Sequence, residues 1–244
     1  MKYKVDNAII MAAGMANRFA PLSYICPKPL LNVKGEILIE RQIQQLKNAG
    51  IYDIIVVVGY MKENFFYLAD KYNVSIVENP EYMVRNNNSS IFAVKDYLGN
   101  SYICSADNYF IKNPFEQEVV GGAYYAAVYS SEKTNEWCLA IDKHDFITGV
   151  TIGGNSQWYM IGHVFWTEEF SKKFVRILEE EYPKEETKSK LWEAIYVEHM
   201  DELKLRIRRY RREEILEFDS LDELKNFDKR YQQKDALEII RDIL

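Results

Sequence analysis

The first 107 residues alternate short apolar runs with stretches in which apolar residues recur at helical spacing. Residues 8–11 form an apolar run that ends in a small-residue turn, and residues 54–58 form another. Between them Ile39, Ile43 and Leu46 recur every three or four residues, as on one face of a helix. Alternation of strand and helix favours a mostly parallel sheet flanked by helices. We therefore predict a Rossmann-like α/β fold.

The alternation of strand and helix patterns ends after Asp107. Four strand-like segments follow with little helix between them, at residues 123–129, 137–141, 147–152 and 159–166. We interpret them as antiparallel additions to the same sheet. Helical patterns at 168–181 and about 188–200, a strand pattern at 205–210 and a helical pattern from Ser220 complete the chain. This organisation predicts one domain over residues 1–225, and a helical tail or a linker to further domains over residues 226–244.

Composition excludes several classes of function. The formal net charge of −6 argues against a protein that neutralises a nucleic-acid backbone. The three cysteines have neither paired spacing nor an accompanying histidine cluster, so no disulfide framework or zinc site is expected. No apolar stretch is long enough for a signal peptide or a membrane span. We expect a cytoplasmic protein that acts on small molecules.

The first candidate site is the turn at residues 12–18, together with Lys28. A small-residue loop after a strand exposes backbone N–H groups to a phosphate, and Arg18 and Lys28 add positive charge. The loop is neither a P-loop nor a dinucleotide fingerprint. Taken without Arg18 and Lys28, the loop could be an ordinary turn with no role in phosphate binding.

The second candidate is Asp107, which follows the apolar strand at 102–104. In open α/β sheets ligands gather at the carboxyl ends of strands, so Asp107 should lie on the same rim as Gly14. A carboxylate there can hold Mg²⁺ against a triphosphate, although an ordinary turn or helix-cap role is the alternative. Glu193 could be a second metal ligand, or one more solvated helical glutamate.

A third feature is a mixture of aromatic and acidic residues at Tyr109, Glu136, Trp137, 158–159 and Trp192. Aromatic faces near a carboxylate can hold a quaternary ammonium group by cation–π attraction. Most aromatic side chains simply fill cores, so this pattern indicates an ammonium site only together with other evidence.

Several segments resemble the sugar-phosphate nucleotidyltransferase superfamily and, within it, the bacterial CTP:phosphocholine cytidylyltransferases. The resemblance covers most of the chain and is carried by residues 11–18, 27–30, 38–60, 86–90, 105–109 and 134–137. It implies a nucleotide-diphospho-sugar transferase-like fold. It also implies Mg²⁺-dependent transfer of CMP from CTP to phosphocholine, giving CDP-choline and pyrophosphate.

The resemblance assigns a role to each candidate residue. It implies that Arg18 and Lys28 bind phosphates and that Asp107 and Glu193 coordinate Mg²⁺. The remaining contacts would be made to the nucleotide by Ala12, Ala13, Gly14, Asn87 and Ser105, and to the acceptor by Tyr109, Glu136, Trp137 and Trp192.

Three residues depart from the family pattern. Ala16 stands where the superfamily loop has glycine, Glu193 stands in place of an aspartate, and Leu191 stands where the headgroup cage has a tyrosine. Leu191 keeps other acceptors open, namely 2-aminoethylphosphonate, phosphoethanolamine or a sugar 1-phosphate. A catalytically silent nucleotide-binding domain is the alternative from another class of function.

Overall fold

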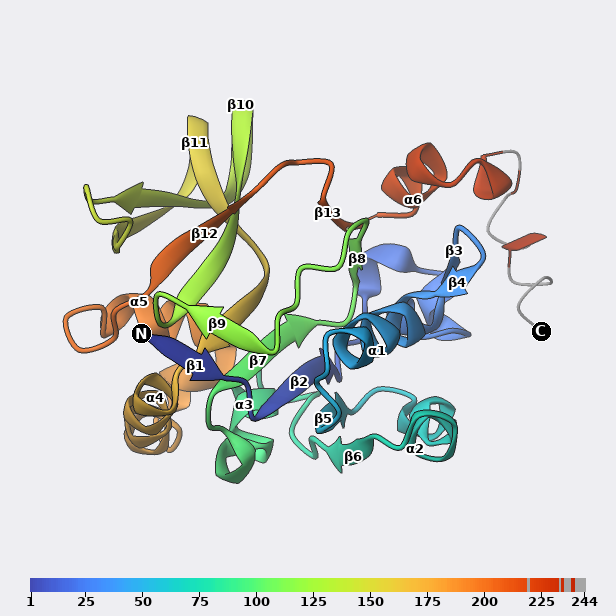
Figure 1. Ribbon diagram of the computed structural model, residues 1–244. Coiled ribbons are helices and arrows are strands. Elements are labelled where there is room, and N and C mark those ends of the chain that lie inside the picture. Colours follow the sequence, from blue (N-terminus) through green and yellow to red (C-terminus); the bar gives the residue numbers. More distant parts are fainter. Residues whose placement is uncertain (219, 233, 235–237, 240–244) are drawn as a thin grey trace.

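The computed structural model describes residues 1–218, 220–232, 234 and 238–239, and its centre is a seven-stranded mixed sheet (Figure 1). Four neighbouring strands are mutually parallel, namely β7 (Ser101–Ser105), β2 (Asn7–Ala12), β5 (Ile54–Val58) and β6 (Ser75–Glu78). Antiparallel β11 (Ile147–Trp166) and β10 (Tyr124–Ile141) extend the sheet beyond β7, and β12 (Arg206–Tyr210) pairs parallel with β10 at the edge. The predicted α/β fold with antiparallel additions is confirmed.

The side-chain alternation of β5 explains why helices cover both faces of the sheet. Ile54, Val56 and Val58 join one buried cluster, to which α1 (Leu38–Asn48) and α2 (Tyr67–Tyr72) contribute. Ile55 and Val57 point the other way and join a second cluster. That cluster receives side chains from α3 (Asn88–Ala93), α4 (Glu168–Glu181) and α5 (Trp192–Glu198). A strand buried on both faces reads as a continuous apolar run, which is how the sequence presents it.

In the antiparallel half of the sheet, two long strands take the place of the four separate strands that we predicted. The segments expected at 123–129 and 137–141 are parts of β10, and those expected at 147–152 and 159–166 are parts of β11. Register shifts between the two strands and the positive φ of Gly153 (80°) let this long hairpin bend, so polar bend residues interrupt the strand pattern in the sequence. Figure 1 shows the hairpin rising as an arm from the sheet.

Other elements are shorter than expected or were missed. The helical pattern at about 188–200 holds the shorter helix α5, which follows the 3₁₀ turn η6 (Glu185–Ser189). The helices α2 and α3 likewise adjoin the 3₁₀ turns η4 (Lys62–Phe65) and η5 (Lys95–Tyr97). Sequence analysis missed four three-residue strands that pair in twos, namely β1 (Lys2–Lys4) with β9 (Glu118–Val120), and β8 (Asn108–Phe110) with β13 (Ile215–Glu217).

A third buried cluster joins the loop after β2 to the C-terminal region. The loop contains η1 (Asn17–Phe19), η2 (Leu22–Tyr24), η3 (Lys28–Leu30), β3 (Asn32–Val33) and β4 (Glu36–Ile37). Against it pack α6 (Leu221–Phe227), which Ser220 caps in a capping box, and η7 (Lys229–Tyr231). Figure 1 shows α6 beside the β3–β4 hairpin. Part of the tail expected at residues 226–244 lies outside the described residues.

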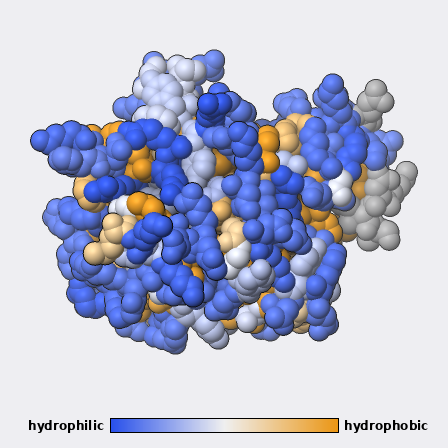
Figure 2. All heavy atoms as spheres, in the orientation of Figure 1, coloured by the Kyte–Doolittle hydropathy of each residue, from blue (hydrophilic) through white to orange (hydrophobic). Residues whose placement is uncertain are grey.

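The visible face of the molecule is mostly hydrophilic, and its hydrophobic side chains appear in scattered patches (Figure 2). In the part of the chain that the structure describes, every helix is too short or too polar to cross a membrane.

Candidate functional site

The candidate site lies at the carboxyl ends of β2 and β7, which are adjacent parallel strands. Met11 of β2 pairs with Ser105 of β7, and the N–H of Ala106 donates to the Met11 carbonyl at 3.2 Å. The loops that follow both strands therefore open onto one cavity of about 440 Å³. The structure brings together there these residues predicted from the sequence: Ala12, Ala13, Gly14, Arg18, Lys28, Asn87, Ser105 and Asp107.

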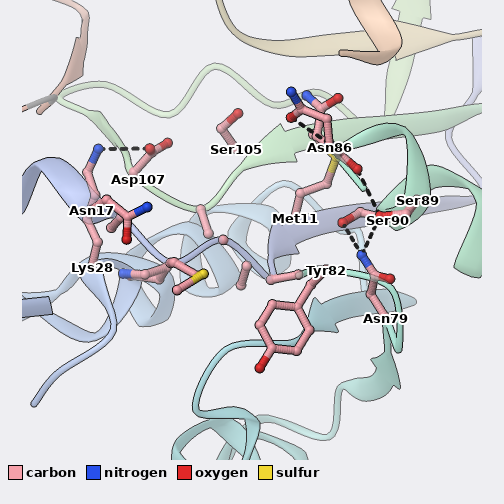
Figure 3. A pocket seen from close by; sticks show the side chains of 18 of the residues that line it. Met11, Asn17, Lys28, Asn79, Tyr82, Asn86, Ser89, Ser90, Ser105 and Asp107 are labelled. Atoms are coloured by element: carbon pink, nitrogen blue, oxygen red, sulfur yellow. Dashed lines mark hydrogen bonds and ion pairs between the residues drawn. The ribbon is translucent and has the colours of Figure 1, made fainter. Parts of the chain in front are cut away.

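An ion pair stands at one end of the cavity (Figure 3). Nζ of Lys28 donates to Oδ2 of Asp107 at 2.9 Å, and it lies 5.0 Å from the ring centroid of Phe19. Lys28 is only 7% exposed. Oδ1 of Asp107 is buried and accepts no hydrogen bond from any described residue. One carboxylate oxygen thus holds the lysine, and the other is left for a further cation.

The loop after β2, which contains Gly14 and Ala16, leaves room for a ligand to approach its backbone closely. A Cβ added at Gly14 would meet no atom within 4 Å, so its place is open space within the cavity lining. Ala16 has φ 48° and ψ 48°, in the left-handed region. That conformation costs a non-glycine residue roughly 1–2 kcal/mol, which gives a physical reason for the family's glycine at this position.

The opposite end of the cavity carries amide and hydroxyl groups. Nδ2 of Asn79 donates to Oγ of Ser89 at 2.8 Å and to Oγ of Ser90 at 3.1 Å (Figure 3). The ring of Tyr82 lies against Gly59, where an added Cβ would come within 2.7 Å of it. This end therefore offers a flat aromatic surface and several hydrogen-bonding groups, as recognition of a nucleobase requires.

Arg85 also lines the cavity and contacts Tyr182 and Glu81. Its guanidinium lies 3.8 Å from the ring centroid of Tyr182, and Nη2 donates to the Tyr182 carbonyl at 2.7 Å. Nε donates to Glu81 at 3.2 Å. Sequence analysis did not single out Asn79, Tyr82 or Arg85, because they lie on an irregular segment between β6 and α3 with no motif of their own.

Glu193 lies outside the lining of this cavity. Its Oε2 accepts from Nδ2 of Asn87, and its Oε1 accepts from the Tyr125 hydroxyl, both at 3.1 Å. Burial raises the pKa of Glu193, and these two hydrogen bonds act in the opposite direction. The structure thus makes Glu193 a support for Asn87, whose Oδ1 also accepts from the N–H of Trp192 at 2.7 Å.

The expected aromatic cage is not assembled at this cavity. Trp192 is 2% exposed and stacks on Tyr125 with 5.7 Å between ring centroids. Tyr109 is buried beneath the C-terminal region, 5.2 Å from Phe227. Trp137 packs half-buried against the second core cluster. All three are used in packing, because aromatic rings that could face a ligand serve equally well in a core.

Glu136 lines a second cavity of about 500 Å³, and Glu217 lines both cavities. Tyr159 contributes an aromatic side chain to the second cavity. Glu217 ends β13 and pairs with Asn108, the residue after Asp107. Sequence analysis missed Glu217, because it follows Ile215 and Leu216 in a short segment that carries no motif.

The donor groups at the first cavity suit a metal held jointly with a ligand. In the described part of the chain no three His, Cys, Asp or Glu residues gather as a metal site. Asp107 nevertheless presents a buried carboxylate oxygen that accepts no hydrogen bond within the described part of the chain. Mg²⁺ commonly takes one or two protein carboxylates plus substrate phosphates. The residues present therefore fit Mg²⁺ bound together with a nucleotide.

Known proteins match this chain over most of its length. Residues 8–156 match the MobA-like NTP transferase domain. A choline-phosphate cytidylyltransferase from Streptococcus pneumoniae is 36% identical, over 88% of this chain and 93% of the relative. A 2-aminoethylphosphonate cytidylyltransferase from Lancefieldella rimae is 37% identical, over 88% of each chain. A solved structure of CTP:phosphocholine cytidylyltransferase from Streptococcus pneumoniae is 34% identical with a TM-score of 0.88, and covers 93% of this chain and 99% of that one.

Proposed function

Because this chain belongs to the MobA-like NTP transferase family, and within it to the cytidylyltransferases, we propose that it transfers CMP from CTP to phosphocholine. The products are CDP-choline and pyrophosphate. One observation carries the proposal: a single cavity joins Arg18 and Lys28, an aspartate with one oxygen that accepts no hydrogen bond from the described residues, and a cluster of amide and hydroxyl groups. These groups match the phosphates, the metal and the base of a nucleoside triphosphate.

The chain's own residues act mainly by binding and orienting the nucleotide. Backbone N–H groups of the loop around Gly14, with Arg18 and Lys28, hold the triphosphate and balance its charge. Asn79, Ser89 and Tyr82 face the base. A phosphate oxygen of phosphocholine attacks the α-phosphorus in line, the new P–O bond forms, and the bond to the β-phosphate breaks. No protein base is needed, because the attacking phosphate is already anionic near neutral pH.

Asp107 would hold Mg²⁺ through the oxygen that makes no hydrogen bond to a described residue. When bound, the ion neutralises the triphosphate and supports the departing pyrophosphate. Glu217 is the carboxylate that shares this cavity with Asp107, whereas both oxygens of Glu193 accept hydrogen bonds elsewhere. We therefore propose Asp107 as the principal metal ligand, and the family's pairing of Asp107 with Glu193 as the alternative arrangement.

For the acceptor we propose the region where the two cavities meet at Glu217. Its carboxylate, with Glu136 and the ring of Tyr159, provides charge and aromatic surface for an ammonium group. A second candidate acceptor is 2-aminoethylphosphonate. It is favoured because Trp192, one wall of the expected choline cage, packs in the core, and because carboxylates can hydrogen-bond a primary ammonium group.

The test is pyrophosphate release by the purified protein with CTP and Mg²⁺, comparing phosphocholine, phosphoethanolamine, 2-aminoethylphosphonate and glucose 1-phosphate. We expect turnover chiefly with phosphocholine. Turnover with a primary amine alone would replace the acceptor and keep the reaction. Binding of CTP without turnover of any acceptor would instead support a silent nucleotide-binding domain.

The proposal includes a cytoplasmic location. All three cysteines are buried free thiols, as a reducing compartment allows.

A further inference from the structure

The loop that carries Arg18 and Lys28 has little regular structure of its own. Between β2 and α1 it contains three 3₁₀ turns, none longer than three residues, and a hairpin of two-residue strands. Such short elements are weak in isolation, because each makes few backbone hydrogen bonds. The position of the two cationic side chains must therefore depend on what packs against the loop.

Part of that packing comes from the C-terminal segment, by which we mean residues 220–232 and Ile239. Leu224 and Ile239 of this segment are fully buried in the cluster that holds Phe19, Leu22 and Leu31 of the loop. Phe19 follows Arg18 directly, and its ring lies 5.0 Å from Nζ of Lys28. The apolar contact thus reaches the neighbourhood of both cations.

Polar contacts fix the same segment to the β3–β4 hairpin. Oδ2 of Asp228 accepts from the N–H of Lys34 at 2.7 Å, and Nη2 of Arg230 donates to Oδ1 of Asn32 at 3.0 Å. The Tyr231 hydroxyl donates to the carbonyl of Asn32. Lys34 has φ 54°, so Asp228 binds the backbone of a turn residue held in the left-handed region.

Asp228 is suited to this anchoring role. Its side chain is 2% exposed and pairs with Arg230. Burial acts to raise its pKa, but the hydrogen bonds from Arg230 and from the Lys34 N–H lower the pKa to about 2. Asp228 is therefore ionised throughout the neutral range, and its contacts do not depend on pH there.

We propose that the C-terminal segment positions the Arg18–Lys28 loop for catalysis, with Asp228 and Tyr231 as positioning residues. Neither of them lines the nucleotide cavity, so their effect passes through the loop. Small displacements of binding groups have large effects on transfer reactions, and an error of about 1 Å can cost a factor of 100 in rate. The inference rests on the proposed function only for its kinetic readout.

The test compares Asp228→Ala, Asp228→Asn and Tyr231→Phe with the wild-type protein. Lys229→Ala is the matched control, because its exposed side chain is the neighbour of Asp228. We measure amide hydrogen exchange, the Kd for Mg²⁺–CTP, kcat and KM. Asp228→Ala should speed exchange at residues 17–34 but not in β5, and should lower kcat/KM about 10-fold or more. Asp228→Asn should restore part of this loss, because its amide oxygen can still accept from Lys34.

Two results would overturn the inference. One is unchanged exchange at residues 17–34 in both Asp228→Ala and Tyr231→Phe. The other is normal kcat/KM in a variant whose loop does exchange faster. Tyr231→Phe keeps the buried ring and carries the test if Asp228→Ala does not fold. A wild-type protein that binds no CTP would refute the proposed function, while the exchange experiment would still decide the structural part.

Discussion

Replacing Asp107 by asparagine keeps the size of the side chain and removes the charge that faces both Lys28 and the proposed metal. A bound ion contributes several kcal/mol of charge stabilisation in the transition state. Since each 1.4 kcal/mol is a factor of ten, we expect kcat to fall at least about 100-fold. The free energy of unfolding should change less than the activation free energy. The asparagine oxygen can still accept from Lys28, so we expect a loss of about 1–2 kcal/mol in the free energy of unfolding.

The ion pair adds a second, opposite effect on nucleotide binding. If Lys28 binds a phosphate of CTP as proposed, that contact competes in the wild-type protein with the 2.9 Å ion pair between Lys28 and Asp107. Asp107→Asn weakens that competition, so CTP should bind without metal at least as tightly as to wild type, and up to about tenfold tighter.

The assays are pyrophosphate release for kcat and calorimetry for CTP binding in the presence of a chelator. Asp96→Asn is the control, since the Asp96 side chain is 85% exposed. Turnover within threefold of wild type would refute the metal assignment. A metal-free CTP affinity that falls as far as kcat would refute the competition between Asp107 and the nucleotide for Lys28.

Three further substitutions test other parts of the site. Gly14→Ala places a methyl group in open cavity space, so it should weaken CTP binding about tenfold in calorimetry with little change in Tm; an unchanged Kd would place the triphosphate elsewhere. Ala16→Gly relieves a left-handed alanine and should raise stability by about 0.5 kcal/mol in urea denaturation, and a loss of stability would contradict the strain argument. Trp192→Phe should lower the free energy of unfolding by about 2 kcal/mol and leave the KM for the acceptor unchanged. A selective rise in that KM would indicate instead that Trp192 contacts the headgroup of the acceptor.

The elements that the sequence predicted best are those with a strong local pattern. The strand at residues 54–58 is an unbroken apolar run, and α4 begins after Thr167, whose side chain caps the helix at Phe170. The strands β8 and β13 could not be predicted in this way. Each has three residues, and its partner lies about 100 residues away, so the pairing of Glu217 with Asn108 leaves no local signal.

The site was predictable to a similar extent. Gly14 and Asp107 follow strands that are adjacent and parallel, so the rule that ligands bind at the carboxyl ends of strands applies to both. Trp192 shows where this kind of reasoning stops. An aromatic ring suits both a ligand-binding cage and a hydrophobic core. Which of the two Trp192 joins depends on residues distant in the sequence, such as Tyr125 and Trp166. The local sequence around Trp192 does not identify those partners.

Glu217 lies on the wall between the two cavities, and this has a thermodynamic consequence. A carboxylate shared by two ligands cannot make independent contributions to both. If a nucleotide in the first cavity alters how Glu217 is placed or charged, the affinity for a cation in the second cavity changes by some factor. Linkage requires the acceptor to change the affinity for the nucleotide by the same factor. In the proposed arrangement, binding of the nucleotide and binding of the acceptor would then be thermodynamically coupled through Glu217, before any bond between the two substrates forms.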